Sequence, residues 1–223
     1  MRSRRRHTLL LGLAMALGPA RALAERGAFT LEGGGAVRLG SLGPSVGAGD
    51  AVMGTLGGAE LTVRYGLSNR LELQAGGFWD APARFAQPRV TVSTPSGDVS
   101  GALTQDVSRW GAAVGVRYAV AGLVWRIPVG FELGWAHTRA TNRDLLDTSD
   151  PRAPVSRLSL ADGGSDELLL APFAGLEWLA TDHLRFSIVP RLELLVGATS
   201  GSTLGVVVPL TVGWSWYWFP GGD

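Results

Sequence analysis

The chain has 223 residues, 46% of them hydrophobic, which suits a single folded domain. It contains no cysteine, so a disulfide framework and a thiolate metal site are both excluded. Twenty basic residues, all of them arginine, face 19 acidic ones. This near balance gives no electrostatic case for nucleic-acid binding.

The first 24 residues have the pattern of a secretory signal peptide. Residues 1–7 are cationic, residues 8–18 are apolar, and Ala22-Leu23-Ala24 is a small-x-small cleavage site. The apolar run is too short for a spanning helix, so an uncleaved anchor is the weaker alternative. Cleavage after Ala24 would remove five arginines and leave a net charge of −4 on residues 25–223, the predicted barrel domain.

Eight later segments alternate between apolar and polar residues, which is typical of strands with one apolar face. In chain order they are residues 29–39, 53–65, 70–79, 107–120, 123–137, 167–179, 184–198 and 203–219. No stretch in this part of the sequence is long and apolar enough for a spanning helix. A membrane location would therefore require a closed barrel.

Residues 123–137, LVWRIPVGFELGWAH, show this pattern most completely. Every odd position from 123 to 135 is apolar, and Trp125 and Trp135 enclose the aliphatic stretch. Ten strand residues at a tilt near 40° cover about 25 Å, the height of the apolar band of an outer-membrane barrel. The segment therefore predicts a strand that crosses a bilayer with a tryptophan at each interface.

The connections between the eight segments differ in length. Short turns are expected at residues 67–69, 121–122 and 181–183, whereas residues 80–106 and 138–165 form long connections rich in Pro, Ser, Thr, Gly and Asp. We interpret both long connections as solvated outer loops and the short turns as periplasmic. An even number of strands then places both termini in the periplasm.

Charged residues occupy the other face of the strands. The row contains six glutamates and six arginines: Glu32, Arg38, Glu60, Arg64, Glu72, Arg117, Arg126, Glu132, Glu177, Arg185, Arg191 and Glu193. The interior of an eight-stranded barrel is just wide enough for side chains to fill it, and paired charges could do so. We therefore predict a structural charge network in the lumen.

The aromatic residues favour a membrane barrel over a soluble barrel of the lipocalin type, which would bury its apolar row. They gather near the two ends of the strands on the apolar face, which is typical of side chains at a membrane interface. The predicted aromatic girdle consists of Tyr65, Trp79, Trp110, Tyr118, Trp125, Trp135, Trp178 and Trp218. The predicted fold class is an all-β, eight-stranded antiparallel up-and-down transmembrane barrel.

From residue 27 to residue 219 the sequence resembles the small eight-stranded outer-membrane proteins of the OmpA/OmpX type. The resemblance implies a monomer in the bacterial outer membrane that contacts lipid and lipopolysaccharide. It also implies that the barrel-assembly machinery reads an aromatic residue at the end of the last strand. Here Trp218 and Phe219 match that pattern in kind, although four residues follow them.

Candidate catalytic and metal-binding residues are few. Outer-membrane lipid A deacylases carry a His and, two residues later, a Ser on the outer wall, but here His137 is followed by Arg139 at the serine position. We expect an interfacial histidine at 137 and a solvated one in the turn at His183. Asp144, Asp147 and Asp150 lack the glycine and glutamate of a known calcium loop. We predict no catalytic, cofactor or metal site.

The expected function is a structural or surface-interaction role through residues 80–106 and 138–165, without enzyme activity. One alternative is an OmpW-like transporter or channel for small solutes, which would need an apolar pocket in the upper lumen. The inward candidates there are small: Gly76, Gly130, Gly134 and Ala136. The other alternative is a lipid A-modifying enzyme that uses His137.

Overall fold

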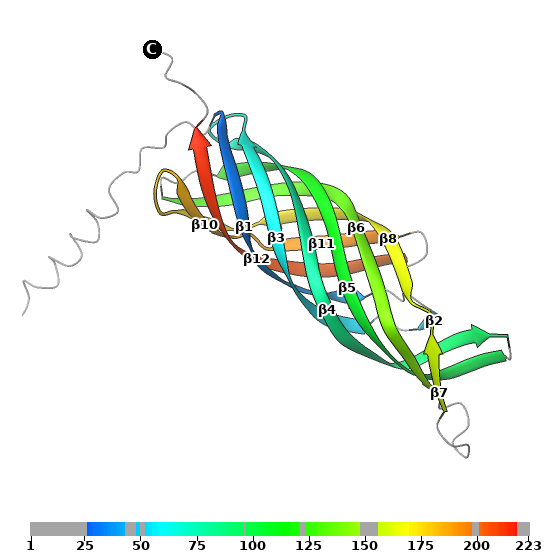
Figure 1. Cartoon of the computed structure of the whole chain (residues 1–223). Coiled ribbons are helices and arrows are strands. Elements are labelled where there is room, and N and C mark those ends of the chain that lie inside the picture. Colours follow the sequence, from blue (N-terminus) through cyan, green and yellow to red (C-terminus); the bar gives the residue numbers. More distant parts are fainter. Residues whose placement is uncertain are drawn as a thin grey trace, which may run out of the picture.

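A computed structural model describes residues 26–42, 48–49, 52–95, 97–120, 124–147, 156–197 and 201–217. The predicted signal peptide, Asp150, Trp218 and Phe219 lie outside these residues. The described part folds entirely as β-strands (Figure 1). It holds no helix that is long and apolar enough to cross a membrane.

Twelve strands make up the described part of the chain. They are β1 (Ala28–Leu42), β2 (Ala48–Gly49), β3 (Val52–Gly66), β4 (Leu71–Thr94), β5 (Gly97–Val120), β6 (Trp125–Asp147), β7 (Ser156–Leu160), β8 (Gly163–Ala174), β9 (Leu176–Leu179), β10 (Leu184–Ile188), β11 (Arg191–Gly197) and β12 (Gly201–Tyr217).

The strands form a closed ring of eight in which neighbours run antiparallel. β8 and β9 are two halves of one wall strand, interrupted at Gly175, and β10 and β11 are two halves of the next, interrupted at Val189 and Pro190. Proline has no N–H to give to a ladder, which explains the second break. β1 pairs with β12 from Ala28↔Tyr217 to Gly40↔Gly205 and closes the ring. The predicted fold class is confirmed.

The two faces of the wall have opposite character. Large apolar side chains point outward and stay exposed; Val114 and Leu210 are 61% and 62% exposed. Glutamate and arginine side chains point inward and are buried. Alternation along each strand produces this arrangement, because successive side chains leave a strand on opposite faces.

The prediction that residues 80–106 and 138–165 are long outer loops is wrong where the structure describes them; residues 96 and 148–155 lie outside the described residues. β4 continues to Thr94 and pairs with β5, which begins at Gly97, in a long hairpin; β6 continues to Asp147 and pairs with β7 over its last five residues. The β4–β5 register shifts between Asp80 and Ala83 and again between Gln87 and Val90. These irregularities contain Pro82 and Pro88, so the prolines interrupt the ladder locally without ending the strand. Figure 1 shows this outer extension, formed by β2, β4, β5, β6 and β7, beyond one end of the barrel.

Apolar side chains fill the extension and the upper lumen. One cluster joins Leu56, Phe85 and Val107, and another joins Val90, Leu103 and Leu145. A third contains Ala136, Leu169, Ala171 and Leu195, with Phe78 packed against it. The expectation that small residues line the upper lumen is therefore wrong, because Leu56, Phe78, Phe85, Leu169 and Leu195 also point inward and are bulky.

The wall contains one interruption between β3 and β4. Their ladder ends at Gly58↔Asp80, and β4 is next paired on that side at Val90, with Gly49 of β2. The Phe85 ring packs against Gly54 of β3 so closely that a Cβ there would lie 1.9 Å from the ring. We call this stretch, residues 81–89 of β4 facing residues 54–57 of β3, the wall gap.

Candidate functional site

The inward charges form the most extensive candidate site in the described residues. All twelve residues of the predicted row point into the lumen, and eleven are buried; Arg191 keeps 12% of its side chain exposed. Eleven of them, together with Asp80, gather in two groups. The turn-side cluster, near the short turns, contains Glu32, Arg64, Glu72, Arg117, Glu177 and Arg185; the central cluster contains Arg38, Glu60, Asp80, Glu132, Arg191 and Glu193.

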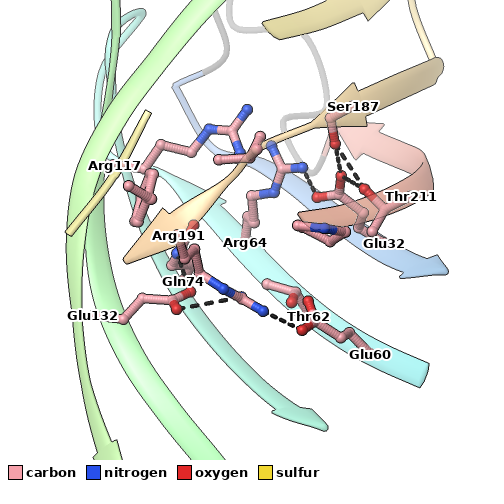
Figure 2. Close-up of a pocket in the computed structure, with 13 residues that line it drawn as sticks. Glu32, Glu60, Thr62, Arg64, Gln74, Arg117, Glu132, Ser187, Arg191 and Thr211 are labelled. Carbon is pink, nitrogen blue, oxygen red and sulfur yellow. Dashed lines mark hydrogen bonds and ion pairs between the residues drawn. The ribbon is translucent and has the colours of Figure 1, made fainter. Parts of the chain in front are cut away.

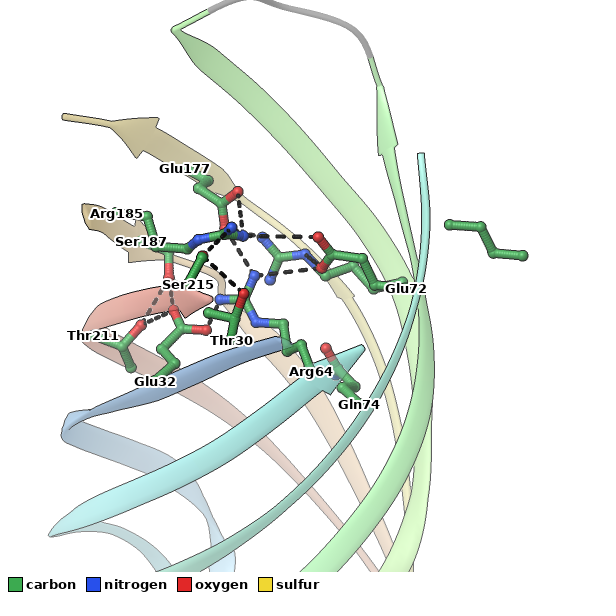
Figure 3. Close-up of polar contacts among 12 residues, drawn as sticks. Thr30, Glu32, Arg64, Glu72, Gln74, Glu177, Arg185, Ser187, Thr211 and Ser215 are labelled. Carbon is green, nitrogen blue, oxygen red and sulfur yellow. Dashed lines mark hydrogen bonds and ion pairs between the residues drawn. The ribbon is translucent and has the colours of Figure 1, made fainter. Parts of the chain in front are cut away.

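Glu177 of β9 is the centre of the turn-side cluster (Figure 3). It accepts hydrogen bonds from Arg64 at 2.9 Å and from Arg117 at 2.5 Å, and Arg185 lies 3.5 Å away. Arg126 faces Glu177 in the β6–β9 register. Three carboxylates and three guanidinium groups of the cluster balance, so their burial leaves no net charge among them.

Hydroxyl groups add hydrogen bonds to the turn-side cluster. Glu32 pairs with Arg64 and accepts hydrogen bonds from Ser187 and Thr211 (Figures 2 and 3). Arg185 donates to the Ser215 hydroxyl at 2.6 Å. Strand alternation positions these short polar side chains on the same inner face as the charges, where they satisfy buried oxygens and nitrogens.

Arg38 of β1 organises the central cluster. Its guanidinium contacts Glu60 at 2.8 Å, Asp80 at 2.7 Å and Glu193, and its cationic carbon lies 4.0 Å from the centre of the Phe78 ring. Arg191 of β11 bridges Glu60 and Glu132, the latter at 3.3 Å (Figure 2). Ion pairs therefore connect β1, β3, β4, β6 and β11 across the lumen.

Three charged residues of the barrel lumen are missing from the predicted row, namely Asp80, Arg109 and Glu167, and Arg143 of the outer extension is a further buried charge. All four are buried. Arg109 donates to the Thr138 hydroxyl at 3.1 Å, and Thr138 donates to Glu167 at 2.9 Å. Arg109 and Glu167 lie within the predicted segments 107–120 and 167–179 but were left out of the row. Asp80 and Thr138 were assigned to loops, and this hid their inward orientation. Continuing the two-residue period beyond the predicted strand ends would have revealed it.

The side chains leave little empty space inside the barrel. A cavity of about 40 Å³ lies among Glu32, Glu60, Arg64, Glu132 and Arg191, and another of about 20 Å³ lies beside the wall gap. Such volumes hold a few water molecules. The described lumen is therefore a packed core of ion pairs with an apolar layer above it.

The structure places seven of the eight predicted girdle residues on the outer surface, and Trp218 lies outside the described residues. Trp110 and Trp135 meet edge to face at 4.6 Å on the extension side of the barrel wall, where Trp79 pairs with Trp110 in register. Near the short turns Trp125 and Trp178 stack at 6.0 Å. Exposed Phe29 and Trp216, missing from the prediction, pack together at 6.3 Å at that same end.

His137 lies beside the tryptophans of the extension-side rim. Its Nδ1 is 2.8 Å from Asp166 Oδ1, and Trp135 Nε1 donates to the same oxygen at 3.1 Å. At the position of the deacylase serine, Arg139 pairs with Asp162 at 3.5 Å. His183 contacts the Ser215 carbonyl at 2.8 Å and stacks on Trp214.

Polar contacts join the strands of the outer extension on its exposed side. Arg84 contacts Asp106 at 3.2 Å, and Asn142 donates to the same carboxylate at 2.7 Å. Arg157 of β7 pairs with Asp144 of β6. The hydrogen bond from Asn142 lowers the pKa of Asp106, and the hydrogen bond from Arg157 lowers the pKa of Asp144. Within the described residues no three His, Asp or Glu side chains are grouped so that they could hold a metal ion.

Comparison with known proteins identifies the fold. No protein-family model and no curated protein sequence matches the chain. Among solved structures it is similar to Ail, the attachment invasion locus protein of Yersinia pestis, with a TM-score of 0.50, 12% identity, and coverage of 86% of this chain and 99% of Ail. It is also similar to Neisserial surface protein A, with a TM-score of 0.55, 11% identity, and coverage of 85% and 99%. The fold is that of the small eight-stranded outer-membrane β-barrels.

Proposed function

We propose that the protein is an integral barrel of the bacterial outer membrane, with its short turns and both termini in the periplasm. The observation that carries this proposal is the belt of exposed Leu, Val and Trp side chains around an interior of buried ion pairs. In water such a belt would be an apolar patch far larger than soluble monomers expose. In a bilayer it is the surface that faces lipid.

The outer extension supports a role in surface interaction. β4 continues fifteen residues beyond Trp79, from Asp80 to Thr94, and β6 continues twelve beyond Trp135, from Ala136 to Asp147. At about 3.3 Å per residue these strands project tens of ångströms past the aromatic rim. Exposed Arg84, Arg139 and Arg157 make this projecting surface polar. Ail is by its name an attachment protein. The corresponding role of this protein would be contact between its outer extension and another surface.

The proposal includes the partners that a barrel of this type requires. Lipid and lipopolysaccharide would contact the two aromatic rings, and the assembly machinery would read the end of β12 during insertion. The protein would act as a monomer, because the ring closes on itself through β1 and β12.

Surface labelling of single cysteines tests this function, and the cysteine-free sequence makes it clean. Ser93→Cys lies near the tip of the extension and Asn69→Cys lies in a short turn. In intact cells a membrane-impermeant maleimide should label only Ser93→Cys, and Asn69→Cys should react after permeabilisation. The reverse labelling pattern would contradict the proposed orientation. If neither variant were found labelled in the membrane fraction, the proposed location would be contradicted.

A second candidate, movement of small apolar molecules, is favoured by one observation. Bulky apolar side chains line the upper lumen as far as the wall gap, where Phe85 fills the space beside Gly54. Phe85→Ala would remove this plug and leave a cavity of the kind that binds a small apolar molecule. If transport occurs here, cells carrying this variant should take up the apolar dye N-phenylnaphthylamine faster than wild-type cells. Equal rates of dye uptake in wild-type cells, in cells with the Phe85→Ala variant and in cells that lack the protein would exclude transport of apolar molecules.

A further inference from the structure

A hollow lies in the outer wall across β3, β4, β5 and β6. Two neighbouring rows of outward side chains border it: Tyr65, Leu73, Val116 and Phe131 form one, and Val63, Ala75, Val114 and Leu133 form the other. Its floor is made by Gln74 and Gly115, and its volume is about 660 Å³. Ala75 in the second row occupies the place that Leu73 occupies in the first row. Its smaller side chain leaves more empty space there.

This groove differs from the surrounding wall in both shape and size. The outside of a barrel is convex, whereas this part is concave and its lining is almost entirely apolar. Its volume falls in the range of about 300–1,000 Å³ that is usual for ligand sites. It lies between the two aromatic rims, so in the proposed membrane orientation it opens toward hydrocarbon chains.

Basic and phenolic groups lie at the short-turn end of the groove. Leu71 and Tyr118 form the next outward pair below Leu73 and Val116, about 7 Å along the strands. The exposed Arg70 donates a hydrogen bond to the Tyr118 hydroxyl at 3.3 Å. Exposed Arg26 precedes Gly27, whose amide donates to the Gly66 carbonyl next to Tyr65. Two arginines therefore stand at the end that would meet lipid headgroups.

We propose that the groove binds one acyl chain of an anionic glycerophospholipid of the inner leaflet, with the lipid phosphate on Arg70. The inference rests on the proposed membrane location and orientation. The acyl chain that binds the groove comes from the surrounding bilayer and not from water. The hydrophobic effect therefore contributes nothing to the preference of the groove for one lipid over another. Selectivity comes from packing of the chain into the hollow and from the charge of Arg70 at the interface.

Native mass spectrometry of the purified protein tests the site directly. Detergent-solubilised barrel is titrated with phosphatidylglycerol or with phosphatidylethanolamine carrying the same chains, and the retained lipids are counted. We expect one phosphatidylglycerol to be retained in preference to phosphatidylethanolamine. Arg70→Gln should reduce this preference about fivefold, the ratio that one basic residue near an anionic headgroup layer supplies. Ala75→Trp fills the groove and should abolish retention of the single lipid.

Matched controls separate the groove from general effects. Val208→Trp places the same side chain at another outward position, on β12, and Arg139→Gln removes an exposed arginine at the opposite rim. Both should bind like wild type. Each variant is first checked for the change in gel mobility on boiling that marks a folded barrel, and Ala75→Leu replaces Ala75→Trp if the larger side chain prevents folding.

Equal retention of the two lipids by the wild type, or undiminished retention by a folded Ala75 variant, would overturn the proposal. Because these outcomes come from folded barrels, they leave the outer-membrane assignment standing. That assignment fails on the cysteine-labelling result instead.

Discussion

Glu177 shows how single residues hold the interior together. Its carboxylate is 1% exposed and receives three guanidinium groups, from β3, β5 and β10. A buried charge cluster of this kind adds little over an apolar core while it is complete, but breaking it leaves buried charges without a partner. The energetic importance of such a residue is therefore visible only when it is removed.

Glu177→Gln should lower the free energy of unfolding by about 3–5 kcal/mol, because Arg64, Arg117 and Arg185 lose their shared negative partner. Urea unfolding in lipid vesicles, followed by tryptophan fluorescence, measures the change. Asp166→Asn is the matched control, since Asp166 is exposed and its loss should cost less than about 1 kcal/mol. Similar losses in both variants would contradict a buried network.

His137 is the residue at which the alternative enzymatic role, modification of lipid A, can be tested directly. Its imidazole contacts Asp166 and two tryptophans, a set of neighbours that suits an interfacial residue as well as a base. We expect His137→Asn to leave the acylation pattern of lipid A unchanged when the protein is produced in cells. Mass spectrometry of extracted lipid A measures this, and loss of an acyl-chain change that depends on the wild-type protein would establish catalysis.

Among the elements, the outer extension has its own stabilising interactions. Apolar residues of β4, β5 and β6 pack on its inner side, and ion pairs among Arg84, Asp106, Asp144 and Arg157 join its strands on the exposed side. The Asn142 backbone, at φ 50°, lies next to the β5–β6 register shift and turns its amide to Asp106. The extension is thus an ordered sheet.

Acid should loosen this sheet. The pKa values of Asp106 and Asp144 are lowered by their hydrogen bonds, so these contacts stabilise the extension above the ordinary carboxyl pKa. The stabilisation is lost as the pH falls through the lowered values. A spin label on Ala86→Cys should therefore become more mobile between pH 7 and pH 3. With Asp106→Asn and Asp144→Asn in the same chain it should be mobile already at pH 7, and an unchanged spectrum in both proteins would contradict this role.

At the scale of the whole molecule, the fold was more predictable than its outer parts. Strict alternation in residues such as 123–137 and 203–217 reports both the strand and its lipid face, because only one face of a barrel wall meets hydrocarbon. Pro82 and Pro88 gave residues 80–106 the composition of a loop. Their placement in bulges depends on β5 pairing across the hairpin, a contact that local sequence does not contain.

The candidate sites were predictable to different degrees. Period-two alternation was enough to find most of the inward charges within the predicted strands, although Arg109 and Glu167 were left out of the predicted row. Asp80 and Phe85, by contrast, became inward residues only through the continuation of β4, and the groove near Ala75 depends on four strands in register. Features made by several distant segments require tertiary structure.

The packed lumen predicts that the barrel does not conduct ions. Ion pairs span the interior, and the described cavities there are at most about 40 Å³. Purified protein in a planar bilayer should show no stable open levels. A chain with Glu177→Gln provides a sensitive comparison, because disruption of the ion pairs is the change that could open a path. Reproducible conductance steps in the wild type would contradict the packed interior.

The central claim, that one face of every wall strand meets lipid, is tested most directly by a spin-label scan of β12. Single cysteines from residue 204 to residue 212 are labelled in lipid vesicles, and the accessibility of each label to dissolved oxygen is measured. Even positions, including Leu204 and Leu210, should be accessible and odd positions, including Val207 and Thr211, should not. Equal accessibility at all positions, or accessibility in the odd row, would contradict a lipid-facing apolar wall.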